Sequence, residues 1–216
     1  MFKGINRVIK AYIYWDLVIN AAWGLLGPIF VIFLLERVAA GDLARGAKIA
    51  GFSSLVYWIV KSVLQIPIGR YLDKNHGEKD DFWFFFFGII ITGLSPFGFL
   101  ISFVPWHIYL FQALHAIGMA MIIPSSYAIF IRHCDKGKEA YESSLDSTLL
   151  GVGAGVTGAI GGIIFAYVGF EIIFIIAGVG TLLSSILIFA IKKEMHPKVP
   201  RNIHELPLQS ETPQTL

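Results

Sequence analysis

The chain has 216 residues, of which 56% are hydrophobic and only 15% are charged, with a formal net charge of +2 at pH 7. With a mean hydropathy of +0.69, this composition excludes a soluble globular protein, because a water-exposed surface of this size needs more charge. The single cysteine, Cys134, excludes a disulfide within the chain. We therefore expect the lipid bilayer as the main surroundings and no nucleic-acid partner.

The apolar residues fall in runs of about 20, the length of helix that crosses a hydrocarbon core of ~30 Å. We predict an all-α membrane protein with six transmembrane helices within residues 11–193. Residues 1–10 are expected to be a cytoplasmic N-terminus, and residues 194–216 a disordered, polar, proline-rich cytoplasmic tail. The six predicted spans are residues 11–35, 48–70, 82–104, 106–132, 141–167 and 170–191.

Most of the 17 lysines and arginines fall on one side of these spans. They lie in the N-terminus, in the second and fourth links between spans, and after the last span. On the other side the sequence places Arg37, Arg45 and Lys48, and Lys61 falls within a span. Because basic links stay in the cytoplasm, both termini are expected to be cytoplasmic.

Lys61 lies in the second span, and at 1.5 Å per residue it is about 12 Å from the cytoplasmic end of the helix at Gly69. This depth is close to the middle of the bilayer, where a lysine is costly and usually faces a cavity. Ser54, Tyr57 and Gln65 share its face of the helix by their spacing. The stripe predicts that Lys61 and Gln65 line an aqueous cavity, and the lysine favours an anionic or polar solute. The alternative is a structural lysine held by a carboxylate or by backbone carbonyls.

Two other spans carry polar residues on one face. Asn20 shares a face of the first span with Asp16, and Gln112 shares a face of the fourth span with His115. We predict that Asn20, Gln112 and His115 line the same cavity, with a packing role as the alternative for His115. Asp16 is expected to extend toward the cytoplasmic surface.

The fifth span is dense in glycine, and four of its glycines recur on one face: Gly151, Gly155, Gly158 and Gly162. Such a smooth stripe lets another helix approach closely, so it predicts a helix-packing surface. The third and sixth spans lack polar stripes, and their apolar runs at 82–87 and 172–176 are expected to face lipid.

The link between the second and third spans begins with Gly69, Asp73 and Lys74. It resembles the loop motif Gly-x-Leu-Ala-Asp-Arg-x-Gly-Arg-Lys of the major facilitator superfamily. Gly69 and Asp73 match the motif by spacing, and Lys74 stands in place of its arginine. Pro67 upstream is also typical of that family, whereas Gln112 stands where the family's fourth helix carries an arginine.

The resemblance covers about residues 10–193 and implies one six-helix half of that family's fold, made of two inverted three-helix repeats. It also implies a second six-helix half as a partner, either a second copy of this chain or a separate chain. Helices one and four would then line the solute cavity. Gly69, Asp73 and Lys74 would form a cytoplasmic gate, and the alternative for Asp73 is a helix-capping residue in a solvated turn.

Taken together, these features predict a secondary transporter that moves a small solute by alternating access, working as a paired half-transporter. The alternative is a non-transporting membrane scaffold or an inactive half-transporter. An enzyme is not expected, because the sequence contains no His-Glu-x-x-His motif, no Gly-x-Ser-x-Gly motif and no P-loop. No catalytic residue, metal site or cofactor is predicted.

Overall fold

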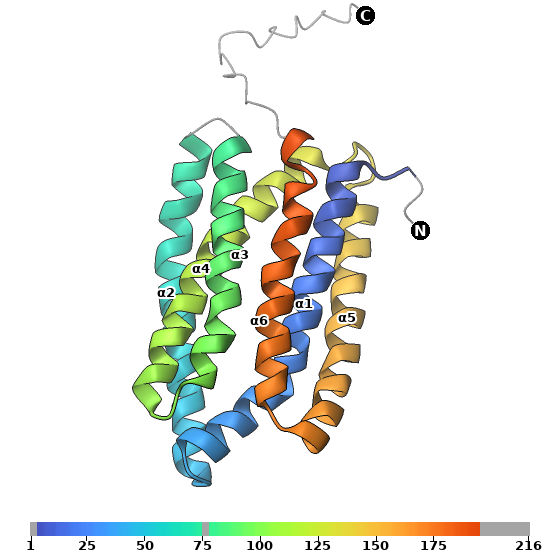
Figure 1. Cartoon of the computed structure of the whole chain (residues 1–216). Helices are drawn as coiled ribbons and strands as arrows, with labels where there is room; N and C mark the ends of the chain where they lie inside the picture. The colour runs from blue at the N-terminus through green and yellow to red at the C-terminus, as the bar shows by residue number, and fades with distance from the viewer. Residues whose placement is uncertain (1–3, 75–77, 195–216) are drawn as a thin grey trace, which may run out of the picture.

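The computed structural model describes residues 4–74 and 78–194 and folds this part of the chain into a bundle of long helices (Figure 1). A π-helical turn, η1 (Leu34–Val38), extends the first helix, and a 3-10 turn, η2 (Lys192–Glu194), follows the last. The loop at 75–77 and the expected tail beyond Glu194 lie outside the described residues. The long helices are α1 (Arg7–Phe33), α2 (Leu43–Lys74), α3 (Glu78–Leu100), α4 (Pro105–His133), α5 (Glu139–Val168) and α6 (Glu171–Phe189).

Local chemistry sets several of the helix ends. Asn6 caps α1, because its side-chain oxygen accepts a hydrogen bond of 3.0 Å from the backbone N–H of Ile9. α3 begins with an acidic turn at Glu78, where the helix dipole favours negative charge. Pro105 opens α4 at a position that needs no N–H donor. α5 ends at Gly169, whose φ of +79° suits a residue without a Cβ.

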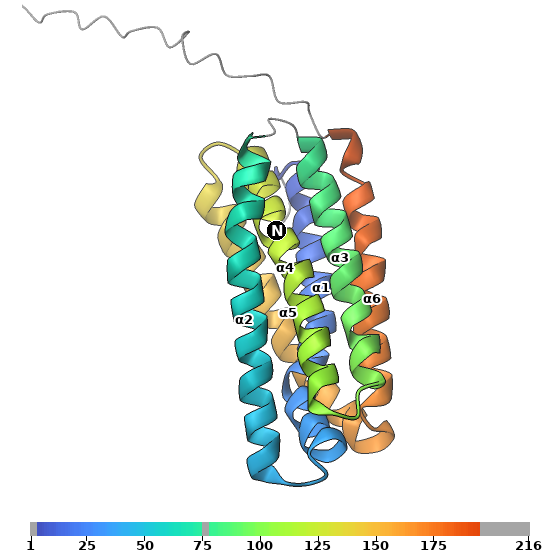
Figure 2. The ribbon, with the colours of Figure 1, turned by 90° about the vertical axis from the view of Figure 1, so that its left-hand side faces the viewer.

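The packing of the helices shows an internal repeat. α1 packs mainly against α5 and α6, α4 packs mainly against α2 and α3, and α3 packs against α6. If α1 is exchanged with α4, α2 with α5 and α3 with α6, the same pairs of helices remain in contact. Successive helices run in opposite directions (Figures 1 and 2), so α1 and α4 are antiparallel and the two three-helix units are inverted. The predicted fold of six helices in a 3+3 inverted arrangement is confirmed.

α3 and α6 are held together by aromatic side chains rather than facing lipid along their whole length. The ring of Phe189 lies 5.4 Å from that of Phe82, measured between centroids, and both Phe82 and Phe174 are buried. The expectation that the runs at 82–87 and 172–176 face lipid is therefore wrong at these positions. A uniformly apolar run has no polar stripe to mark its inner face, so the sequence does not show which side is covered.

The most exposed helices are α2 and α5. In their most apolar stretches only 11% and 6% of the residues are buried, against 39–50% in the other four long helices. Their exposed side chains are large and apolar, as at Phe52 and Trp58 of α2 and at Val152 and Ile163 of α5. These two helices thus offer surfaces suited to lipid or to another protein within the membrane.

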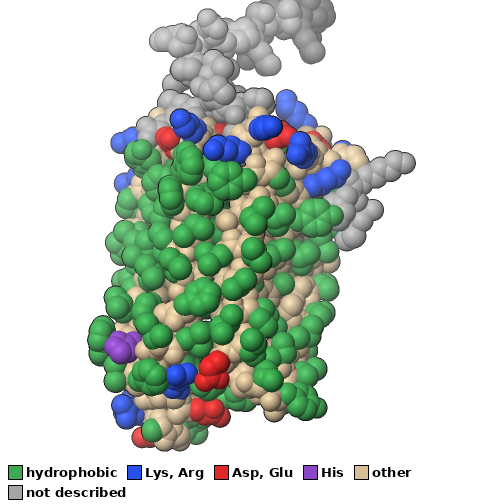
Figure 3. Space-filling model, viewed as in Figure 1, with side chains coloured by type: hydrophobic (Ala, Val, Ile, Leu, Met, Phe, Trp, Pro, Cys, Tyr) green, Lys and Arg blue, Asp and Glu red, His purple; other side chains and the backbone are tan. Residues whose placement is uncertain are grey.

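The described part of the chain contains six helices that are long and apolar enough to cross a membrane. Hydrophobic side chains form a broad band on the visible face, and charged side chains gather above and below it (Figure 3). This is the distribution of a bundle whose middle lies in hydrocarbon and whose ends meet water. The protein is an integral, multi-pass membrane protein.

The start of α1 and the end of α6 lie at one end of the bundle, which we call the terminal end. Arg7 and Glu194 form an ion pair there, with 3.1 Å between Nη1 and Oε1. The Asn6 amide donates hydrogen bonds to the backbone carbonyl of His133, at 2.6 Å, and to the Asp135 carboxylate, at 3.0 Å. The second of these bonds holds the pKa of Asp135 below its usual range.

Two further contacts at the terminal end join the start of α3 to the end of α4. The Arg132 guanidinium pairs with the fully buried carboxylate of Asp81. Nε2 of His133 lies 3.1 Å from the carboxylate of Glu78, which is also buried. The two helices are therefore fixed at this end by charge as well as by apolar packing.

Cys134 follows α4 at the same end, where its thiol donates a hydrogen bond of 3.1 Å to the carboxylate of Glu142. Burial, followed by this contact with Glu142, raises the pKa of Cys134 to about 12. The thiol is therefore protonated at neutral pH and has little nucleophilic character.

Candidate functional site

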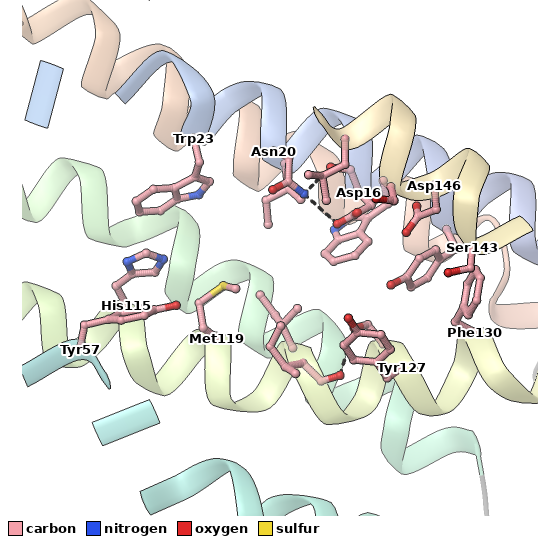
Figure 4. A pocket seen from close by; sticks show the side chains of 18 residues that line it. Asp16, Asn20, Trp23, Tyr57, His115, Met119, Tyr127, Phe130, Ser143 and Asp146 are labelled. Atoms are coloured by element: carbon pink, nitrogen blue, oxygen red, sulfur yellow. Dashed lines mark hydrogen bonds between the residues drawn. The ribbon is translucent and has the colours of Figure 1, made fainter. Parts of the chain in front are cut away.

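A cavity of about 550 Å³ lies between α1 and α4 and is lined also by α5 and by Tyr57 of α2 (Figure 4). Along α1 it extends from Tyr12, near the terminal end, to Trp23. Tyr127 of α4 and Ser143 of α5 lie on its wall and are exposed, so it opens between these two helices. Its volume falls within the range of about 300–1,000 Å³ that is usual for sites of small molecules. We call it the main cavity.

Two carboxylates face the main cavity from neighbouring helices: Asp16 from α1 and Asp146 from α5 (Figure 4). The Asn20 amide donates to the carboxylate and to the backbone carbonyl of Asp16, both at 2.8 Å. Oδ1 of Asp146 is shielded from solvent and has no hydrogen-bond partner in the described part of the chain. The end of the cavity near α5 is therefore acidic.

An aromatic layer closes the other end of the main cavity. The rings of Trp23 and His115 stack at 4.0 Å between centroids, only 11° from parallel, and Tyr57 lies 5.1 Å from His115. All three side chains also line a second cavity of about 230 Å³, which reaches Phe30 on α1 and Gln112 on α4. The layer therefore separates two cavities that follow one another along the bundle.

Three of the five predicted cavity residues line one or the other of the two cavities, rather than a single shared one. Asn20 lines the main cavity, Gln112 lines the second cavity, and His115 lines both. Lys61 and Gln65 line neither of the two, although Tyr57 and Ser54 on the same stripe of α2 do.

Lys61 instead lies at the margin of the bundle. Its ammonium is over the ring of Trp58, 4.7 Å from the centroid, and 5.7 Å from that of Tyr57. The side chain is partly exposed, and Trp58 is exposed. The charge is thus stabilised by aromatic faces at the edge of α2.

The predicted gate residues lie at the terminal end of α2. Asp73 and Lys74 are exposed there, on the last turn of the helix. Gly69 is one turn earlier, where an added Cβ would lie 3.7 Å from Pro124 of α4, an ordinary contact distance. The gate motif thus borders the α2–α4 contact and faces outward.

The glycine stripe of α5 makes little contact within the chain. A Cβ added at Gly151, Gly155 or Gly162 would meet nothing within 4 Å, and one at Gly158 would lie 3.5 Å from the carbonyl oxygen of Gly24. The closest approach of α5 to α1 uses other glycines: a Cβ at Gly153 or Gly161 would collide with Leu17 or Leu25.

Sequence reasoning missed Asp146, and it assigned Asp16 to the surface rather than to the cavity. A signal for Asp146 does exist in the sequence. Ser143, Asp146 and Ser147 follow helical spacing on one face of the first turns of α5, as Ser54, Tyr57 and Lys61 do on the second span. Among the described residues, no three His, Cys, Asp or Glu side chains come together as a metal site.

Comparison with known protein families gives one match: the model described as Major Facilitator Superfamily covers residues 17–212. A search of curated proteins finds no match. The matched range takes in the greater part of α1 and all of the helices from α2 to α6.

Proposed function

The chain belongs to the major facilitator superfamily of membrane transporters, and on this basis we propose that it carries a small solute across the membrane by alternating access. The observation that supports this most is the pair of cavities on either side of the Trp23–His115 stack. A thin layer of side chains between two cavities can open to one side while the other stays closed. In this arrangement the stack is the barrier that a solute must pass.

The orientation follows from the distribution of charge. Lysines and arginines predominate at the terminal end, and the opposite end carries Arg37, Arg45 and Lys48. The positive-inside rule therefore puts the terminal end, with both termini, in the cytoplasm. The main cavity then lies on the cytoplasmic side of the aromatic layer, and the second cavity on the outer side.

A second six-helix half completes the transporter, either as a second copy of this chain or as a separate chain. The main cavity is open between α4 and α5, and the two least buried helices, α2 and α5, are outermost (Figure 1). The glycines Gly151, Gly155 and Gly162 have room for a close approach by another helix. A second half seated on this face would cover the cavity and use the glycine stripe.

The predicted site residues take distinct roles in this assembly. Asn20, Gln112 and His115 contact the solute from α1 and α4. Gln65 borders the cavity from α2 once the second half is in place, whereas Lys61 stays over Trp58 at the edge of α2. At the cytoplasmic end, the exposed Asp73 carboxylate, with Gly69 and Lys74 beside it, meets a basic group or a helix end of the partner half.

Removing the indole of Trp23 tests the barrier. Proteoliposomes that contain the chain are screened for uptake of small solutes, with and without a proton gradient. For a solute that accumulates, Trp23→Ala should lower the ratio of internal to external solute concentration by about tenfold. Losing one aromatic contact lowers the barrier to back-leakage by about 1.4 kcal/mol, which makes the leak about tenfold faster. The solute would leak back through the opened layer.

Trp106→Ala is the matched control, because Trp106 is an exposed tryptophan at the start of α4, away from both cavities. Accumulation should be unchanged in this variant. If the helical, reconstituted protein moves none of the solutes screened, the transporter proposal fails and a non-transporting scaffold or inactive half takes its place.

A further inference from the structure

The main cavity is acidic. The 18 described residues that line it include two carboxylates, Asp16 and Asp146, and neither a lysine nor an arginine. Its other titratable groups are three phenols and one imidazole: Tyr12, Tyr57, Tyr127 and His115. A solute that enters this space therefore meets two carboxyl groups and no basic ammonium or guanidinium group among the described lining residues.

The two carboxylates lack a full set of partners within the described chain. They face the same space from neighbouring helices (Figure 4). Asn20 donates to Asp16, whereas Oδ1 of Asp146 is shielded from solvent and receives no hydrogen bond from the described residues. Ionised groups within membrane-spanning helices are costly unless they are paired. What this site lacks is a positive charge.

The walls of the cavity are aromatic. Tyr12, Trp15, Trp23, Tyr127 and Phe130 all line it. Ring faces attract cations, above all substituted ammonium groups, whose alkyl substituents also bury well against rings. Trp15 is only 2% exposed, yet its indole N–H has no acceptor among the described residues. This donor is satisfied if the solute also carries a hydrogen-bond acceptor.

We infer that the main cavity binds an organic cation, with a substituted ammonium group between Asp16 and Asp146 and a hydrogen-bond acceptor facing the Trp15 N–H. The inference rests on the proposed function, because it names the class of solute for that cavity. It reverses the expectation drawn from Lys61, whose ammonium lies over Trp58 and is not among the lining residues.

Benzoylcholine is a suitable probe, because it combines a permanent trimethylammonium group, an ester acceptor and an aromatic ring. Its uncharged isostere is 3,3-dimethylbutyl benzoate, in which carbon replaces the quaternary nitrogen. Binding of both is measured by equilibrium dialysis against the full chain in lipid nanodiscs. Benzoylcholine should bind at least about tenfold more tightly than the isostere, since a desolvated cation–π contact is worth about 2 kcal/mol.

The carboxylates are tested one at a time. Asp16→Asn and Asp146→Asn keep the size of each side chain and remove its charge. Each should weaken benzoylcholine binding by about tenfold or more, because two unit charges about 4 Å apart near a protein surface attract by about 4 kcal/mol. The affinity for the neutral isostere should not change. Asp42→Asn is the matched control, because Asp42 is exposed at the far end, before α2, and should leave both affinities unchanged.

Two results would overturn the inference: equal affinity for benzoylcholine and its neutral isostere, or benzoylcholine binding that survives both carboxylate substitutions. The proposed function fails separately. If benzoylcholine binds as expected but no solute crosses proteoliposomes, the site stands and transport does not. If proteoliposomes accumulate only neutral or anionic solutes and the carboxylate variants bind as the unaltered chain does, transport stands and the cation site does not.

Discussion

Replacing Arg132 with methionine should lower the free energy of unfolding by about 3–5 kcal/mol, the usual effect of removing one partner from a buried ion pair. The Asp81 carboxylate is fully buried at the start of α3, and the Arg132 guanidinium from the end of α4 neutralises it. Without the arginine this negative charge loses its ion-pair partner while it stays out of water. Unfolding is followed by helical circular dichroism while sodium dodecyl sulfate is added to mixed micelles.

Two further variants make this test specific. Arg7→Met removes a largely exposed arginine from its ion pair with Glu194 and should have a much smaller effect. The double variant Asp81→Leu/Arg132→Met removes both charges of the pair and should regain most of the lost stability. An equal loss in Arg7→Met and Arg132→Met would show that the buried pair has no special role.

Gly161→Ala should destabilise the bundle by about 1–3 kcal/mol, the usual cost of forcing an extra methyl group into a packed interface. An added Cβ would meet the backbone carbonyl of Leu25, with the Leu25 Cα at 3.1 Å. Backbone atoms of α1 cannot rotate away as a side-chain tip would, so α1 and α5 must separate. The same detergent titration measures the loss.

The neighbouring Gly162→Ala is the matched control. A Cβ at Gly162 would meet nothing within 4 Å, and alanine is favoured over glycine in a helix by up to about 1 kcal/mol. The Gly162→Ala chain should be as stable as the unaltered one, or slightly more stable. If the two alanine variants lose the same stability, the close α1–α5 contact at Gly161 is wrong.

The six spans could be predicted because length and apolar composition alone determine them in a bilayer. The faces of α1 and α4 could also be predicted, because Asn20, Gln112 and His115 are polar residues at helical spacing. For α2, spacing places Lys61 and Gln65 on the face of Tyr57, but it does not fix how the helix is rotated against its neighbours. In the structure Tyr57 faces the main cavity, whereas Lys61 lies beside Trp58 at the edge of the bundle.

Glycine spacing was ambiguous for a related reason. α5 carries glycines on several faces, and the most regular series, which includes Gly151 and Gly155, is not the one that contacts α1. Gly153 and Gly161 make the close approach, and only the positions of the Leu17 and Leu25 atoms reveal it. The shape of the partner helix decides which face of a glycine-rich helix it contacts.

The central claim is that the space between α1 and α4 holds water and is open to solutes. It can be tested with single cysteines in a Cys134→Ser background, which removes the chain's one native thiol. Met119 lines the main cavity, whereas Leu183 is exposed on the apolar surface of α6.

The measurement is the rate at which a positively charged, membrane-impermeant methanethiosulfonate modifies Met119→Cys and Leu183→Cys in membrane fragments open on both sides. Modification of Met119→Cys should be much faster, because only a thiol in contact with water ionises and reacts. A Met119→Cys thiol as unreactive as Leu183→Cys would contradict the account.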